Sequence, residues 1–560
     1  MTSSNNFLPH LNKHIPKAAN NYMLSTYSII QEAWKRGLSI NIRILREASG
    51  SIEPYYSISD GIKTHHFSAT RGDLVSVEAK ELTKNKQTTK EYLLKNNVPT
   101  PEGNEFKENI SDEEILNYAN HIEYPVVVKP IASTGGRGVI ANIQNDEELK
   151  EALSYVRIKL DSPHIILEKF YEGDDYRLYV LDNQVIGAIK RMRSNVIGNG
   201  KDSIKTLIKN KNKKRMQLPS LSNRPIKVDD ETRTLLKRKN YTLDSIPDAD
   251  EVVYLKTKNN VSAGGDSIDV TDQVSENIKS IAIAAANSFP SLPHCGLDMM
   301  VNEEEDTGVI IELNSRAHIT QHLFPMEGKA RDIPKHIIDL YFPDTKDYNQ
   351  EEANKLYIDY DFIYNACLSR SAAEIYIPKI PSSPIALKRF IISNCDYTDN
   401  LGSRVRRIAF NNKVNGYIKP LENGNIAVII GGNEKHVGTF AKKLKSYIKR
   451  LNPAGSIIEK NRTTPIPHGF YIDFNFTTET TNPSAGKNAN EVYLSKYSDL
   501  KAEYQKLVKK LADYEQKEAL MNLTSKQNKQ LKKQLKQLET STSWKLTKPL
   551  RNLGKIAKRK

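Results

Sequence analysis

A short apolar run that ends in a lysine and enters a glycine-rich loop most constrains how this chain can fold. The run is Tyr124-Pro-Val-Val-Val-Lys129, and its β-branched residues predict a buried strand. The loop Pro130-Ile-Ala-Ser-Thr-Gly-Gly-Arg-Gly138 follows, and its glycines let backbone N–H groups approach an anion closely. It is not a Walker loop, because no Gly-Lys-Ser/Thr follows. Taken alone, a glycine turn of this kind is more often structural than functional.

Composition excludes several classes of protein. The chain has 560 residues with 82 Lys or Arg and 67 Asp or Glu, a formal net charge of +15, and a balance of apolar and charged residues typical of a globular protein. Its three cysteines, Cys295, Cys367 and Cys395, are too few and too far apart for a disulfide scaffold. Neither a membrane-spanning run nor an apolar secretory signal is found. We therefore expect a cytoplasmic protein.

Helical and strand patterns alternate along the chain and predict an α/β (α+β) protein of several folding units. The segment after residue 490 differs, because Tyr497, Leu500, Tyr504, Leu507 and Leu511 form a coiled-coil seam. The expected units are an N-terminal α/β region at 1–80, a large domain at 81–345, a linker at 346–384, a small domain at 385–450, a second linker at 451–490, a coiled coil at 491–540 and a basic tail at 541–560.

Six short motifs follow the glycine-rich loop in order along the chain. They are Glu168-Lys-Phe170, Gly173-Asp-Asp-Tyr-Arg177, Val196-Ile-Gly-Asn-Gly200, Asn260-Val-Ser-Ala-Gly-Gly265, Gly296-Leu-Asp298 and Glu312-Leu-Asn-Ser-Arg316. Over residues 81–345 their order and spacing resemble the ATP-grasp ligases, most closely the ATP-grasp module of cyanophycin synthetases and bifunctional glutathione synthetases. The resemblance implies an ATP-grasp fold and the cofactors ATP and Mg²⁺.

Three oxygen-bearing side chains are the predicted metal ligands. Glu312 and Asn314 alternate on one face of a predicted strand, and Asp298 lies on the strand before it. Mg²⁺ prefers a few carboxylate and carbonyl oxygens combined with nucleotide phosphates. The alternative is that Asp298 caps a turn and Glu312 pairs with a surface lysine.

Nucleotide-binding residues are predicted on both sides of the glycine loop. An unpaired ammonium at the end of an apolar strand is costly, so Lys129 is expected to pair with phosphate. The resemblance adds Lys86 at a helix start and Glu168 and Phe170 at an adenine hinge, although Lys86 could be solvated and Phe170 could belong to the core. The full predicted set is Lys86, Lys129, Thr134, Gly135, Gly136, Gly138, Glu168, Phe170, Asp175 and Asn260.

Cations that clamp the developing phosphoryl charge are the predicted catalytic residues. The resemblance implies Arg177, Lys256 and Arg316. His318 and His322 are spaced like metal ligands, but a structural role is favoured for them because the Mg²⁺ ligands are assigned elsewhere.

Residues 385–450 predict a ferredoxin-like sandwich, since strand, helix, strand, strand and helix patterns follow in order. They resemble an acylphosphatase domain through Gly416-Tyr-Ile-Lys-Pro-Leu-Glu-Asn-Gly424. The positions that match that family's phosphate-binding arginine and catalytic asparagine hold Gly402 and Pro420. We therefore expect a catalytically inactive relative, with Arg404 as a shifted substitute as the remaining alternative.

The C-terminal segments predict partners. The coiled-coil seam favours a homo-oligomer, and the basic tail either contacts anionic lipid at the inner face of the membrane or is simply solvated. Nucleic acid is not expected, because no aromatic-studded basic groove accompanies the charge. The tail Ser541-Thr-Ser-Trp-Lys-Leu-Thr-Lys-Pro-Leu-Arg551 looks like the ends of some bacterial surface-polysaccharide glycosyltransferases, which hints at cell-envelope synthesis.

The resemblance implies a ligase that joins a small-molecule carboxylate to an amine. The acid, an amino acid or peptide-like compound, would be activated as an acyl phosphate before the amine forms an amide. The alternatives are a non-catalytic nucleotide-binding scaffold and an acylphosphatase.

Overall fold

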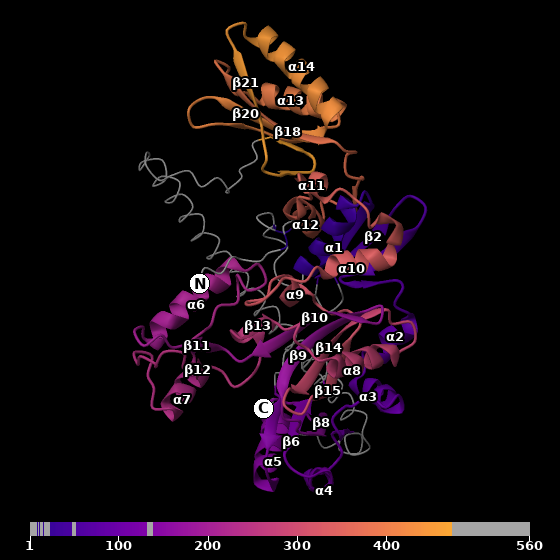
Figure 1. The fold of residues 1–560 in the computed structure, drawn as a ribbon, viewed down its shortest axis with the longest axis vertical. Coiled ribbons are helices and arrows are strands. Elements are labelled where there is room, and N and C mark those ends of the chain that lie inside the picture. The colour runs from indigo at the N-terminus through magenta and orange to yellow at the C-terminus, as the bar shows by residue number, and fades with distance from the viewer. Residues whose placement is uncertain are drawn as a thin grey trace, which may run out of the picture. The chain divides into compact units, whose positions relative to one another are not determined.

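A computed structural model describes residues 8, 11, 15, 23–46, 52–131 and 138–472 (Figure 1). Its helices and sheets confirm the mixed α/β class. The predicted residues Thr134, Gly135 and Gly136, the predicted coiled coil and the basic tail lie outside the described residues. Among the described helices, none has the length and apolar composition that crossing a bilayer requires.

The N-terminal region forms a five-stranded antiparallel sheet in the order β17-β1-β2-β3-β4. Helix α1 packs on this sheet, and all of its residues are buried, with Leu24, Tyr27, Ile30 and Trp34 among the large apolar ones. The elements are α1 (Met23–Lys35), β1 (Ser39–Arg46), β2 (Ile52–Ser59), β3 (Thr64–Ser68), β4 (Arg71–Gly72), α2 (Val77–Leu82) and α3 (Lys86–Lys95).

The predicted strand before the glycine loop is β6, which lies inside a four-stranded sheet of order β5-β8-β6-β7. Two helices cover the sheet with apolar stripes, and Ile115, Ala119 and Ile122 of α4 show the spacing that buries one helix face. The elements are β5 (Gly103–Phe106), α4 (Asp112–Ile122), β6 (Val126–Pro130), β7 (Ile140–Ile143), α5 (Asp146–Leu153), η3 (Ser154–Lys159) and β8 (Ile165–Lys169).

The third sheet, in the order β13-β10-β9-β14-β15, carries the acidic motifs. Its β9–β10 hairpin turns at Asp182 and Asn183, and both residues have positive φ, as a tight two-residue turn requires. Helix α8 packs against β9, β10, β14 and β15. The elements are β9 (Asp174–Leu181), β10 (Gln184–Met192), β13 (Asp266–Asp269), α8 (Glu276–Asn287), β14 (His294–Asn302) and β15 (Thr307–Asn314).

A small subdomain with its own apolar core interrupts this sheet between β10 and β13. Its two strands pair with each other and with no other sheet of the described residues. Its elements are β11 (Asn195–Ile197), α6 (Ile204–Gln217), α7 (Asp230–Arg238), β12 (Val252–Tyr254) and η4 (Val261–Ala263).

The segments expected to be linkers are structured where they are described, over 346–384 and 451–472. Within 346–384, β17 completes the N-terminal sheet, and strands at 456–472 extend the second small domain. These strands are two to six residues long, too short for periodicity to reveal. The connecting elements are α9 (Thr320–Leu323), α10 (Ile333–Tyr341), η5 (Pro343–Thr345), α11 (Gln350–Ala353), β16 (Leu356–Tyr357), α12 (Tyr360–Leu368) and β17 (Ile375–Ile377).

The second small domain has the strand order β21-β18-β20-β19, with β23 beside β19. This is the order of a ferredoxin-like βαββαβ sandwich. Helices α13 and α14 bury Val405, Ala409, Phe440 and Leu444 against the sheet. Its elements are β18 (Ile385–Ser393), α13 (Asp399–Asn411), β19 (Asn415–Pro420), β20 (Ile426–Asn433), α14 (Glu434–Leu451), β21 (Ser456–Asn461), β22 (Ile466–Pro467) and β23 (Phe470–Ile472).

Candidate active site

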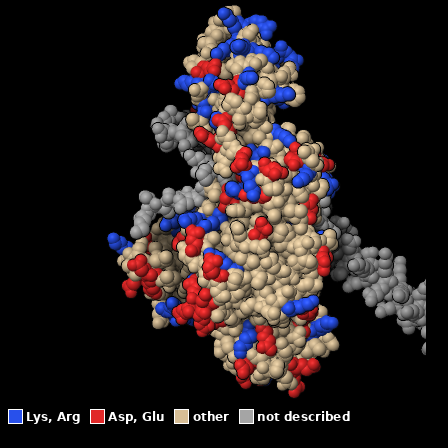
Figure 2. Space-filling view, turned by 45° about the vertical axis from the view of Figure 1, so that its right-hand side comes forward, with Lys and Arg blue, Asp and Glu red and all other residues tan. Residues whose placement is uncertain are grey.

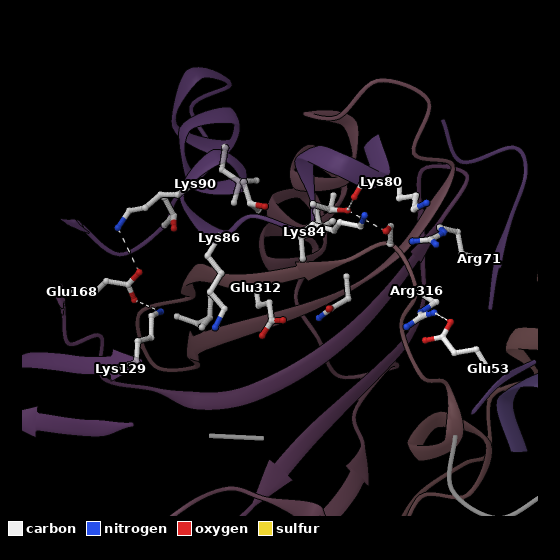
Figure 3. Close-up of a pocket in the computed structure, with 18 of the residues that line it drawn as sticks. Glu53, Arg71, Lys80, Lys84, Lys86, Lys90, Lys129, Glu168, Glu312 and Arg316 are labelled. Carbon is white, nitrogen blue, oxygen red and sulfur yellow. Dashed lines mark hydrogen bonds and ion pairs between the residues drawn. The ribbon is translucent and has the colours of Figure 1, made fainter. Parts of the chain in front are cut away.

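A polar cavity of about 460 Å³ opens among the N-terminal sheet, helices α2 and α3, and strands β6, β8 and β15 (Figure 3). It therefore gathers side chains from segments far apart in the sequence. Seven cations line it, Arg71, Lys80, Lys84, Lys86, Lys90, Lys129 and Arg316, together with the three carboxylates Glu53, Glu168 and Glu312. Such an excess of positive charge suits an anionic ligand.

Two lysines share one carboxylate at one end of the cavity. Lys129, at the end of β6, lies 2.5 Å from Oε2 of Glu168, and Lys90 of α3 lies 3.6 Å from Oε1. Burial, assisted by the nearby charge of Lys129, lowers the pKa of Lys90 despite the attraction of Glu168. Lys129 was expected to need a phosphate as its partner, and here Glu168 supplies the opposite charge.

Lys86 is the first residue of α3, where Asn85 caps the helix by accepting a hydrogen bond from the backbone N–H of Thr88. Its side chain lines the cavity and reaches from the helix toward Glu312 (Figure 3). Lys86 and Lys90 are four residues apart and so share a helix face. This spacing is the signal that could have identified Lys90, which the sequence analysis missed.

The three predicted metal ligands lie on one face of the third sheet. Across the β14–β15 ladder, Asp298 is opposite Glu312 and Gly296 is opposite Asn314, and directly opposed residues share a face. Glu312 and Asn314 line the cavity, whereas Asp298 lies beside them without lining it. The structure therefore has the arrangement predicted from sequence, with Glu312 and Asn314 on one face of a strand and Asp298 on the strand before it.

Asp298 is held by two arginines on neighbouring strands. Nη1 of Arg177 and Nη2 of Arg191 both donate to Oδ1, at 2.6 and 2.5 Å. Burial alone would raise the pKa of Asp298, but the two guanidinium groups outweigh it and lower the pKa below its usual value. Within the described residues, Oδ2 is the oxygen that remains for a metal ion.

These residues fit a magnesium ion that is shared with a nucleotide. In the described part of the chain, no three His, Cys, Asp or Glu side chains cluster as they would in an all-protein metal cage. Mg²⁺ is usually held by one or two carboxylates plus phosphate oxygens, and Glu312 with Asn314 offers such a partial set beside the cationic lining.

Asp175 adds a carboxyl group to the same face. It lies opposite Arg191 across the β9–β10 ladder, 3.4 Å from that guanidinium. Burial raises the pKa of Asp175 to about 6, although Arg191 opposes the rise. Arg191, which the sequence analysis missed, thus bridges Asp175 and Asp298, and its position on the hairpin directly opposite Asp175 was the available signal.

The far end of the cavity is formed by the N-terminal sheet. Arg316 forms an ion pair with Glu53 of β2 and also lies 3.3 Å from Ser68 Oγ. Arg71 of β4 has no ion pair of its own among the described residues, and burial together with Arg316 lowers the pKa of its guanidinium. Neither Glu53 nor Arg71 was predicted, because the first 80 residues were read only for their fold.

Other predicted residues lie outside the cavity. Lys256 forms ion pairs with Asp229 and Glu231 in the inserted subdomain, and Asn260 caps the short helix η4. The backbone N–H of Phe170 donates to the carbonyl of Pro125, 2.9 Å away, and its ring does not line the cavity.

The described end of the glycine loop and the two histidines complete the predicted set. Gly138 has φ of +77°, and a Cβ there would lie 2.7 Å from the ring of Pro130. His322 is buried, and His318 and His322 both have lowered pKa values, about 4 and about 3, chiefly because of burial. A buried neutral His322 agrees with the structural role expected for it.

Comparison with known proteins finds a family match for a segment that supplies part of this cavity. Residues 83–219 match the family described as the RimK-like ATP-grasp domain. This segment is therefore similar to a RimK-like ATP-grasp domain, and the predicted resemblance to the ATP-grasp ligases is confirmed. ATP-grasp ligases use ATP and Mg²⁺, so the predicted cofactors are those of the family.

Two curated relatives extend the similarity beyond that segment. Over 329 residues the chain is 32% identical to the glutathione biosynthesis bifunctional protein GshAB of Clostridium perfringens. The aligned segment covers 57% of this chain and 41% of the relative. Over 332 residues it is 30% identical to the cyanophycin synthetase of Trichormus variabilis. That aligned segment covers 58% of this chain and 35% of the relative. The chain thus spans about two fifths of the length of these relatives.

A solved structure of a bifunctional glutathione synthetase from Pasteurella multocida is also similar. It is 26% identical, with a TM-score of 0.42, and the match covers 52% of this chain and 41% of that one.

Proposed function

We propose that this protein is an ATP- and Mg²⁺-dependent ligase that joins a carboxylate to an amine through an acyl phosphate. One observation carries the proposal: Glu312 and Asn314, on a single strand, line the same cavity as Lys86 and Lys129. Oxygen ligands for Mg²⁺ and cations for phosphate are therefore within one space. Similarity to a GshAB protein and a cyanophycin synthetase supports this chemistry.

In this proposal, each end of the cavity has a different task. Lys86, Lys90 and Lys129 would neutralise nucleotide phosphates, and Glu312 and Asn314, with Oδ2 of Asp298 beside them, would hold Mg²⁺. ATP supplies the phosphoryl group, and Mg²⁺ offsets part of its charge. Phosphoryl transfer depends mainly on such positioning and charge neutralisation.

The acid substrate would bind at the end formed by the N-terminal sheet. Among the described residues, the lining holds seven cations and three carboxylates, and Glu81, outside the lining, pairs with Lys84 and lies 3.9 Å from Lys80. Arg71 has no ion-pair partner among the described residues, so a substrate carboxylate is the natural partner for it. The activated carboxyl group would then be held near Glu312, between Arg71 and the phosphate-binding lysines.

Amide formation by this route requires no covalent bond between a protein side chain and the substrate. The acid is activated as an acyl phosphate, the amine attacks its carbonyl carbon, and phosphate leaves as the amide forms. No nucleophilic serine or cysteine is needed, and the two buried cysteines of the described residues, Cys295 and Cys367, have raised pKa values because of burial. An amino acid or peptide-like acid in cell-envelope or polymer synthesis is the proposed substrate.

The test is ADP release with Mg²⁺, ATP and a panel of amino acids, short peptides and amines. We expect release to depend on one acid and one amine, and Glu312→Gln to reduce it by at least about 100-fold because a metal ligand is lost. Glu305→Gln, an exposed carboxylate in the β14–β15 turn, is the matched control and should retain full activity. If the protein binds nucleotide but no pair of acid and amine causes ADP release, a non-catalytic scaffold is favoured.

Two proposals concern segments beyond the described residues. The seam at 491–540 would form a homo-oligomer, and the tail at 541–560 would contact anionic lipid. Light scattering of the full chain and of a chain ending at residue 490 tests the first, because only the full chain should be larger than a monomer. Loss of vesicle binding on removing residues 541–560 tests the second.

A further inference from the structure

Two adjoining depressions on the helical side of the C-terminal sandwich are lined by cations and by no carboxylate. One lies along α13, the other lies between α13 and α14, and Arg404 lines both. The cations are Arg404, Arg406, Arg407, Lys442, Lys443 and Arg450. We call this surface the helical face.

The cations of the helical face have no ion-pair partner in the described part of the chain. Among the ion pairs of residues 23–46, 52–131 and 138–472, none includes any of the six. Arg404 lies over the ring of Tyr447, with 5.8 Å to its centroid, and Lys443 donates to the side-chain oxygen of Asn412 at 3.1 Å. The active-site cavity differs, because there Lys129 and Arg316 each face a carboxylate.

The charge belongs to the whole helical layer of this domain. Helices α13 and α14 together contain nine Lys or Arg and two Asp or Glu. Figure 2 shows Lys and Arg side chains gathered over the sandwich at the top of the view, with fewer Asp and Glu among them. A surface with this imbalance attracts an extended anion rather than a single small one.

One large apolar side chain lies in the middle of these cations. Phe410 is 82% exposed, and Arg406 and Arg407 precede it by four and three residues, so the three share a helix face. At the end of α14, Leu451 is 51% exposed and directly follows Arg450. Exposed apolar residues flanked by Lys and Arg characterise helices that lie in a membrane interface.

We propose that the helical face docks the protein on an anionic lipid bilayer, with its cations on the headgroups and Phe410 inserted between them. A single-stranded nucleic acid is the less suitable partner, because its binding channels stack several bases on several aromatic rings. Among the described residues that line this face, Phe410 is the one exposed aromatic residue, and the half-buried ring of Tyr447 lies under Arg404. This inference does not depend on the ligase activity or on the tail at 541–560.

The experiment measures co-sedimentation of the full chain with vesicles of phosphatidylcholine, alone or mixed with phosphatidylglycerol. We expect binding to the anionic vesicles only. The variant Arg406→Gln/Arg407→Gln/Lys442→Gln should lower partitioning by about 100-fold, since each basic residue near such a surface contributes about a fivefold factor. The matched control, Arg233→Gln/Lys237→Gln/Arg238→Gln on exposed positions of α7, removes the same charge and should have a much smaller effect.

A tryptophan at position 410 separates a bilayer from other anions. In Phe410→Trp/Trp544→Phe, the other tryptophan is Trp34, which is buried. The emission of the tryptophan introduced at position 410 should shift to shorter wavelength with anionic vesicles and remain unchanged with a single-stranded RNA oligonucleotide. Equal losses in the two triple variants, or vesicle binding without a shift, would overturn the proposal, as would a shift with RNA alone.

Discussion

Arg177 and Asp298 lie directly opposite each other across the β9–β14 ladder, with 2.6 Å between Nη1 and Oδ1. Asp298 is thereby fixed on the sheet face that also carries Glu312 and Asn314. The resemblance assigned Arg177 to the phosphoryl group, but in the described structure its partner is a carboxylate. We infer that Arg177 positions Asp298 for the metal ion.

Replacement of Arg177 tests this pairing. Arg177→Met leaves a buried carboxylate with Arg191 as its remaining cation, so we expect the free energy of unfolding to fall by about 2 kcal/mol in urea titrations. Lys190→Met on β10 is the control, because its partners Asp174 and Glu303 are largely exposed and surface ion pairs contribute at most about 1 kcal/mol. Equal losses in the two variants would contradict a special role for the buried pair.

Local sequence patterns predicted the strands and the alternating ligands well. Glu312 and Asn314 lie on a strand whose alternation is visible in the sequence, and the hairpin at Asp182 and Asn183 follows from turn chemistry. The elements of the sandwich from β18 to α14 follow from equally local signals, whereas β21, which completes its strand order, does not.

The parts of the site that were missed depend on contacts between distant segments. Glu53 and Arg71 line the cavity with Arg316, which follows both by more than 200 residues and pairs with Glu53, and no local pattern encodes that contact. Lys256 was expected at the site, but the inserted subdomain folds around its own core and gives Lys256 the partners Asp229 and Glu231.

Substitution of Arg71 tests the proposed subsite for the acid. Arg71→Gln removes a cation that has no ion pair among the described residues, so it should raise the KM for the acid by at least about tenfold, the value of one charge-assisted hydrogen bond. The KM for ATP should stay unchanged, because the lysines of α3 and β6 are retained. Lys63→Gln, exposed in the turn between β2 and β3, is the control; a parallel rise in the KM for ATP would refute a separate acid subsite.

Buried histidines should make the protein sensitive to acid. His294 lies between the hydroxyl groups of Tyr179 and Tyr341, at 3.0 and 3.2 Å, and burial lowers its pKa from 6.5 to about 4. The unfolded chain therefore takes up a proton near pH 6.5 that the folded protein takes up only near pH 4, so stability falls as the pH falls through this window.

This titration can be isolated by substitution. Between about pH 7.5 and pH 5.5, His294 should account for about 1 kcal/mol of lost stability. His294→Asn lowers stability at both pH values but should remove that share of the pH dependence in urea unfolding. If the free energy of unfolding of His294→Asn changes with pH as steeply as that of the unsubstituted protein, then other groups, such as His322 and His468, carry the effect.

Gly416 belongs to the motif from which the acylphosphatase resemblance of the sandwich was predicted, and its surroundings offer a steric reason for a glycine there. Its φ is +134°, and a Cβ at this position would lie 2.0 Å from the carbonyl oxygen of Ile429 on the paired strand. Gly416→Ala should therefore destabilise the domain by about 3 kcal/mol or more, through backbone strain and overpacking together.

The matched control is the turn glycine of the same motif. Gly424 has φ of +79° with no neighbour within 4 Å of a Cβ, so Gly424→Ala should cost only about 1 kcal/mol from backbone strain. Thermal unfolding of both variants measures the difference. If Gly416→Ala is the more damaging, then this motif glycine is required by the close approach of β19 and β20, and its presence is no argument for phosphatase chemistry. Equal effects would remove that steric explanation.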